Sequence, residues 1–214
     1  MTQFLIYFGY FLLGVNTIFL LIGFKKNDIP FKIFCVYSIF MCIVQFISWY
    51  LAMQHERNIF MSHYYFWLQF FTLSAFFYYL IRSKKIKRII KINTLVISLI
   101  GIISYLIYPQ HYFTYSYVEI IVTTFAIVGY ALIHLYNLLS QEKKYYNIMV
   151  GLIIYLFGST IVFLTGNLFL SFPKGFYTKI WLLNIGLYVV YQGFILYELI
   201  LLYLKNYKYE YTRR

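Results

Sequence analysis

Apolar residues run along the chain in seven stretches, and each stretch is bounded by a short polar segment. About 20 apolar residues are the length that an α-helix needs to cross the hydrocarbon core of a bilayer. The pattern therefore predicts seven transmembrane helices, over residues 4–24, 33–53, 62–81, 89–108, 117–139, 148–172 and 180–204. The three prolines lie between these stretches, as expected for a residue without a backbone N–H: Pro30, Pro109 and Pro173.

The composition supports this interpretation, because 63% of the residues are hydrophobic and only 11% are charged. Soluble domains carry about 25% charged residues. All connecting segments are too short to hold a soluble domain, so we predict an all-α polytopic membrane protein with a single domain over residues 1–214. The first residues, Met1-Thr2-Gln3, lack the basic segment of a cleaved signal peptide, and the first helix is expected to stay in the membrane.

The basic residues are distributed unevenly between the two sides of the predicted bundle. Three of the 18 lie on one side, namely Arg57, Lys174 and Lys179, and the other fifteen lie on the opposite side. Cytoplasmic loops are enriched in Lys and Arg, which predicts an external N-terminus and a cytoplasmic C-terminus. Contact with anionic lipid then accounts for the net charge of +12, and no nucleic acid partner is expected. Abundant Ile, Phe, Tyr, Lys and Asn favour a bacterial source, and hence the cytoplasmic (inner) membrane.

Polar residues recur at helical spacing within two of the predicted spans. The stripe in the fifth span consists of Glu119, Thr123, Ala126, Tyr130, His134 and Asn137, and the stripe in the seventh consists of Asn184, Tyr188, Tyr191, Ile195 and Glu198. Exposure of such groups to lipid is costly, so both stripes should face the interior of the bundle. In the sixth span, small residues seven apart predict a seam of close helix packing: Gly151, Gly158 and Thr165.

Depth in the membrane groups several of these polar side chains near the external surface. We predict that they surround an outward-facing ligand pocket: His63, Gln69, Glu119, Asn167, Asn184 and Tyr188. The alternative is that they only hydrogen-bond the helices to one another. No catalytic motif, metal-binding spacing or cofactor signature is present, and the seventh span has no lysine for a retinal Schiff base. Cys35 and Cys42 are too far apart along one helix to form a disulfide.

Several short motifs between residues 31 and 193 resemble those of a family of small uncharacterised seven-helix bacterial integral membrane proteins. They are Phe31-Lys32-Ile33-Phe34, His63-Tyr64, Glu119, Leu156-Phe157-Gly158-Ser159, Trp181, Asn184 and Tyr188. The resemblance implies the seven-helix fold and carries no activity. It also implies an acidic residue where this chain has Gln69, a departure that weakens the case for a paired-carboxylate site.

Four functions remain open from the sequence. The preferred one is a sensor or adaptor that binds a small molecule or lipid in the outer pocket and signals through a separate cytoplasmic or membrane protein partner. A small transporter or channel would use the stripes of the fifth and seventh spans as a polar path. A structural subunit of a membrane complex needs no ligand. An enzyme acting on lipid would use His63 and Glu119 as acid and base.

Overall fold

A computed structural model describes residues 2–140, 144–169 and 174–212, and the side-chain surroundings of residues 3–140, 144–165 and 179–204. Within these residues the chain forms seven α-helices, one short 3-10 helix and no strand. The helices are α1 (Thr2–Gly23), α2 (Ile29–Met53), α3 (Met61–Leu80), α4 (Lys84–Ile107), η1 (Pro109–Phe113), α5 (Tyr117–Leu138), α6 (Tyr146–Phe169) and α7 (Lys174–Thr212).

Several helices begin before the apolar stretch that predicted them, because polar side chains cap their first turns. Asp28 precedes α2 and accepts a hydrogen bond from the backbone N–H of Phe31 (3.2 Å). Ser83 caps α4 in the same way, so most of the basic segment that was predicted as a loop is helical. The prediction that Pro30 lies between helices is wrong, because this residue occupies the first turn of α2, where its missing N–H is not needed.

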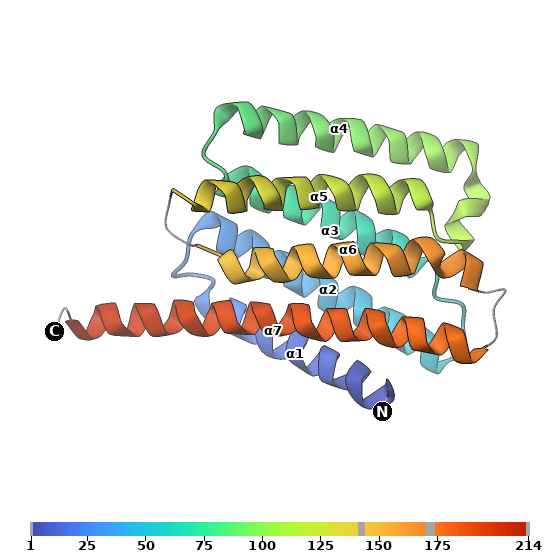
Figure 1. Ribbon diagram of the computed structural model, residues 1–214, viewed down its shortest axis with the longest axis horizontal. Coiled ribbons are helices and arrows are strands. Elements are labelled where there is room, and N and C mark those ends of the chain that lie inside the picture. Colours follow the sequence, from blue (N-terminus) through green and yellow to red (C-terminus); the bar gives the residue numbers. More distant parts are fainter. Residues whose placement is uncertain (1, 141–143, 170–173, 213–214) are drawn as a thin grey trace.

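Six of the helices form a closed ring in the order α1, α2, α3, α5, α6 and α7, with α7 packed back against α1. Helix α4 lies outside this ring and packs against α3 and α5, at one edge of the bundle in Figure 1. Only Ile90, Ile97 and Gly101 are buried along α4. A Cβ at Gly101 would collide with the indole of Trp67, so this glycine lets α4 approach α3 closely.

Successive helices run antiparallel, and the two termini lie at opposite ends of the bundle (Figure 1). We call one end of the bundle the basic end, because exposed Lys25 and Lys84 mark it, together with Lys144. The opposite end, which holds the N-terminus and the α2–α3 connection, is called the outer end. In the part of the chain that the structure describes, six helices, all except α3, are long and apolar enough to cross a membrane. The structure therefore supports a multi-pass helical membrane protein.

Two predictions about helix packing are confirmed. Both polar stripes face inward, since Glu119, Thr123 and His134 are buried on α5, and Asn184 and Glu198 on α7. The glycine seam of α6 packs closely against α7. A Cβ at Gly151 would lie 2.6 Å from the Cβ of Phe194, and one at Gly158 would collide with Leu187.

Polar contacts at the basic end join the ends of different helices. Asp28 accepts hydrogen bonds from Lys144 (2.5 Å) and from the hydroxyl of Tyr145 (2.8 Å). Partial burial of Asp28 opposes its ionisation, but these hydrogen bonds outweigh that effect and hold its pKa below the usual value. On α7, Glu198 accepts hydrogen bonds from the backbone and side-chain nitrogens of Asn147 (3.0 and 2.7 Å), and so caps the first turn of α6.

Candidate functional site

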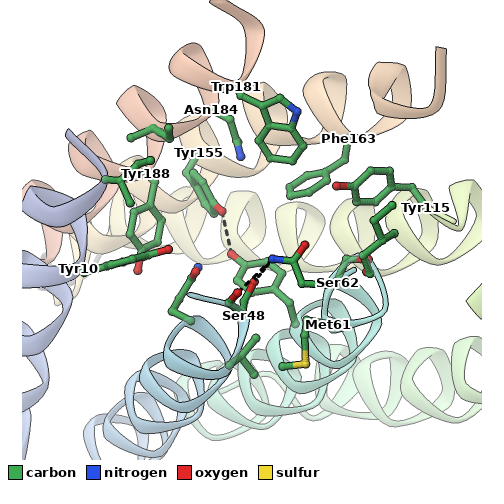
Figure 2. A pocket seen from close by; sticks show the side chains of 17 residues that line it. Tyr10, Ser48, Met61, Ser62, Tyr115, Tyr155, Phe163, Trp181, Asn184 and Tyr188 are labelled. Carbon is green, nitrogen blue, oxygen red and sulfur yellow. Dashed lines mark hydrogen bonds between the residues drawn. The ribbon is translucent and has the colours of Figure 1, made fainter. Parts of the chain in front are cut away.

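A cavity of about 380 Å³ lies inside the ring of helices at its outer end (Figure 2). Side chains from α1, α2, α3, α6 and α7 line it, together with Tyr115 from the segment before α5. Its volume falls within the range of small-molecule sites, about 300–1,000 Å³. Among the described residues that line the cavity, none is Asp, Glu, Lys, Arg or His, and most of the lining is aromatic, aliphatic or amide.

A layer of tyrosines forms the floor of this cavity. The hydroxyls of Tyr65 on α3 and Tyr155 on α6 lie 2.8 Å apart and are hydrogen-bonded across the ring, as the dashed line in Figure 2 marks. Beneath them, the ring of Tyr191 stacks on that of Tyr155, with 5.3 Å between centroids. The side-chain amide of Gln69 donates to the hydroxyls of Tyr65 (3.2 Å) and Tyr37 (3.3 Å). Gln69, Tyr37 and Tyr191 therefore lie on the side of the cavity that faces the basic end.

Two buried polar atoms near the cavity have no hydrogen-bond partner in the described part of the chain. They are the side-chain carbonyl oxygen of Asn184 and the hydroxyl of Tyr188, both on α7, and both residues line the cavity. A buried polar atom without a partner costs about 1–3 kcal/mol. Of the ten such atoms in the described residues, these two are the ones whose residues line the cavity. A bound ligand or water would satisfy both atoms.

His63 and Glu119 form a separate cluster. The Nδ1 of His63 lies 2.7 Å from Oε2 of Glu119, and both side chains are buried. Tyr105 on α4 donates to the same oxygen (2.5 Å), and its hydroxyl also lies 2.8 Å from His63 Nδ1. The ring of Tyr112 in η1 stacks on the imidazole, with 5.7 Å between centroids. The cluster therefore joins α3, α4 and α5 at the outer end.

The six residues predicted to line one pocket are thus divided between three places. Asn184 and Tyr188 line the cavity, and Gln69 lies in its floor. His63 and Glu119 do not line the cavity, because His63 is two residues from Tyr65 and so projects from the opposite face of α3. The remaining residue, Asn167, belongs to α6, but its side chain lies outside the described residues.

Sequence reasoning missed several residues at both places. Tyr10, Phe163 and Trp181 line the cavity, and so does the polar pair Ser48 and Asn58. Tyr105 was missed as well, because a single tyrosine near a span end is typical of the interfacial aromatic belt. The one signal in the sequence was the angular position of these residues around the helix axis. Ser62 and Tyr65 point to the cavity side of α3, and His63, which lies between them in the sequence, does not.

Two of the polar residues predicted along a transport path, His134 and Glu198, have structural partners. Nε2 of His134 lies 3.1 Å from the backbone carbonyl oxygen of Lys144, and Glu198 caps α6. The side-chain amide of Asn16 on α1 donates to the backbone and side-chain oxygens of Gln192 on α7 (both 2.9 Å). No group of three His, Cys, Asp or Glu side chains that could hold a metal occurs in the described part of the chain.

Comparisons with protein-family models, with curated proteins and with solved structures found no match to this chain. The family resemblance carried by motifs such as Leu156-Phe157-Gly158-Ser159 therefore stays a prediction. Function has to be argued from the cavity and the residues around it, because a helical bundle alone does not specify one.

Proposed function

We propose that the chain crosses a bacterial cytoplasmic membrane seven times, with its N-terminus outside. The six strongly apolar helices account for six crossings, and α3 is the seventh. Its hydropathy is lower because it carries His63 and Gln69, but half of its residues are buried among its neighbours, which shields these groups from lipid. The positive charges of Lys25 and Lys84 favour a cytoplasmic location for the basic end.

Single-cysteine labelling in intact cells tests this orientation. Replacement of Cys35 and Cys42 by Ala provides the background, into which Arg57→Cys or Ser140→Cys is introduced. Arg57 is exposed at the outer end and Ser140 at the basic end. An impermeant maleimide should label residue 57 in intact cells, and residue 140 only after permeabilisation. The reverse pattern would invert the topology.

We infer that the protein is a ligand-binding sensor or adaptor, and that the ligand occupies the outer cavity. The observation that supports this best is the combination of a 380 Å³ cavity with unpartnered polar atoms on Asn184 and Tyr188. An apolar cavity with a few convergent polar groups is the usual form of a small-molecule site. Helix α7 carries both residues and continues to Thr212 at the basic end, so it connects the site to the surface that a cytoplasmic partner would contact.

Binding can be measured by thermal unfolding of the purified protein against lipid extracts and small metabolites. A ligand that binds only the folded state raises the melting temperature. We expect Asn184→Leu to remove this shift, because it deletes the amide while keeping the volume. Ile185→Trp should remove it by filling the cavity, whereas Val190→Trp, on the exposed face of α7, should not. If Asn184→Leu and Ile185→Trp both respond like the wild type, the ligand does not bind in this cavity.

The other functions gain less support from these contacts. A transporter needs a path past the tyrosine floor, where Tyr65, Tyr155 and Tyr191 lie across the ring. Substrate flux into proteoliposomes would reveal such a path. An enzyme using His63 and Glu119 would need substrate access to a buried pair that does not line the cavity. Absence of any thermal shift across a broad library would favour the structural-subunit alternative, which pull-down of a partner would then test.

A further inference from the structure

Aromatic rings line two opposite sides of the outer cavity. Tyr115, Phe163 and Trp181 lie on one side, and Tyr10, Tyr155 and Tyr188 lie on the other (Figure 2). The face of an aromatic ring carries partial negative charge and its edge partial positive charge. Aromatic rings from several elements of the fold therefore border the space that a ligand would occupy.

Contacts between the rings fix their orientations at steep angles. The rings of Phe163 and Trp181 are 5.7 Å apart at 86°, and those of Tyr115 and Phe163 are 5.5 Å apart at 62°. Across the cavity, Tyr155 and Tyr188 are 5.8 Å apart at 64°. Such packing holds the rings before any ligand arrives, which lowers the conformational cost of binding.

Two of the polar side chains that line the cavity already donate hydrogen bonds within the protein. The side-chain amide of Asn58 donates to the backbone and hydroxyl oxygens of Ser48 (both 3.1 Å), so these donors are already used within the protein. The Ser62 hydroxyl likewise donates to the carbonyl oxygen of Ile59 (2.7 Å). The unpartnered Asn184 oxygen is an acceptor. An anion would find no cationic side chain among the described lining residues.

We propose that the cavity binds a quaternary ammonium cation. This deepens the ligand-binding function proposed above and rests on it. A cation over the faces of Trp or Tyr is attracted by the ring quadrupole, and such rings form the known recognition sites for quaternary ammonium groups. A primary ammonium has three N–H donors and a compact, strongly hydrated charge, so a carboxylate would hold it best. The described lining has no carboxylate, whereas a methylated nitrogen needs no hydrogen bond.

Choline and its neutral isostere 3,3-dimethylbutanol test the charge requirement, because the two differ only in replacement of the quaternary nitrogen by carbon. Titration into the purified protein, followed by thermal unfolding and calorimetry, should show choline binding at least about tenfold more tightly. Equal binding of both would overturn the proposal while leaving a ligand cavity in place. No binding of choline would overturn it as well. Stabilisation by other metabolites, lost in Asn184→Leu, would then keep the cavity function.

Variants at Tyr188 separate the ring face from the hydroxyl. Tyr188→Phe keeps the π-face and removes the unpartnered hydroxyl, so choline affinity should change by less than about threefold. Tyr188→Leu removes the ring, and affinity should fall at least about fivefold. The Tyr64→Leu control removes an exposed ring outside the cavity and should leave affinity unchanged. Equal affinity of Tyr188→Phe and Tyr188→Leu would contradict binding through the ring.

The cation could be a free solute or the headgroup of a lipid, and both share this chemistry. Nanodiscs of phosphatidylethanolamine and phosphatidylglycerol, with and without phosphatidylcholine, distinguish the two sources. If phosphatidylcholine competes with free choline, the apparent choline affinity falls in its presence and the lipid headgroup is the ligand. If the affinity is unchanged, the site takes the soluble cation. Either result requires that choline binds.

Discussion

Removal of a single oxygen at Tyr105 tests the contact that joins α4 to the ring of helices. The Tyr105 hydroxyl donates to Oε2 of Glu119 at 2.5 Å, and the Glu119 side chain is only 3% exposed. Neutral hydrogen bonds between membrane helices contribute about 0.6 kcal/mol on average. A hydrogen bond to a charged group contributes about 1.5–3 kcal/mol. If Glu119 is ionised, Tyr105→Phe should therefore lower the free energy of unfolding by about 1.5–2 kcal/mol.

A double-mutant cycle isolates this contact from other effects of the substitution. Tyr105→Phe, Glu119→Gln and the double variant are unfolded in mixed micelles with increasing sodium dodecyl sulfate, and tryptophan fluorescence follows the transition. We expect a coupling energy of about 1 kcal/mol or more, because each single variant removes the same charged contact. Tyr64→Phe is the control, since the Tyr64 side chain is exposed and its hydrogen bond to Tyr112, at 3.2 Å, should contribute little.

The size of the coupling decides between two descriptions of the cluster. A value near 0.6 kcal/mol would correspond to a neutral carboxylic acid that accepts an ordinary hydrogen bond. A value below about 0.3 kcal/mol would refute the inference that Tyr105 holds α4 against α3 and α5. Because the cluster does not line the cavity, neither Tyr105→Phe nor Glu119→Gln should remove ligand-dependent stabilisation in molecules that remain folded.

Three further perturbations have definite expected outcomes. Gly158→Val should lower the free energy of unfolding by about 1–3 kcal/mol, because its side chain would collide with α7. The control is Gly186→Ala, whose added Cβ meets no atom within 4 Å and should cost less than about 1 kcal/mol in the same denaturant titration. Because the pKa of Asp28 is lowered in the folded state, ionised Asp28 contributes stability that is present above its unfolded pKa and lost as the pH falls through its lower folded pKa. Asp28→Asn keeps the helix cap and should flatten the dependence of stability on pH below about pH 4. The loss at neutral pH should stay below about 1 kcal/mol, since Lys144 and Asp28 are both more than a third exposed. Glu198→Ala should destabilise the protein more than Glu198→Gln, because Oε2 of Glu198 accepts both hydrogen bonds from Asn147 and glutamine retains an oxygen acceptor that alanine lacks. Thermal unfolding would rank the two variants.

Hydropathy predicted which segments are helical, but not where several of the helices begin. The apolar stretch marks the part of a helix that can contact lipid, and a helix continues beyond it wherever a cap and good helix formers allow. The N-terminus of α4 shows this, since Ser83 caps a first turn of lysines and arginine that hydropathy assigns to a loop. Asp28 likewise caps α2, so that the helix begins before Pro30.

The sequence predicted how deep in the membrane the residues of the candidate site lie, but not which way their side chains point. His63, Gln69 and Asn184 all come from the outer half of the chain's predicted spans, and the sequence gives no information on how far each helix is rotated about its axis within the bundle. The structure places Gln69 one turn from Tyr65 on the cavity side of α3, and His63 on the opposite side. The exclusion of α4 from the ring has the same origin, because neighbour relations depend on packing that no single span encodes.

The partners of the buried polar groups distinguish structural roles from binding. Glu198 caps a helix, and the amide nitrogen of Asn16 joins α1 to α7, so these groups have structural roles within the fold, although the side-chain oxygen of Asn16 keeps no partner among the described residues. Asn184 differs because it is buried, lines a cavity and retains an acceptor without a partner. Polarity inside a membrane indicates only that a partner is needed. A ligand is expected where an unpartnered polar group also lines a cavity, which makes α7 at the outer cavity the place to look for one.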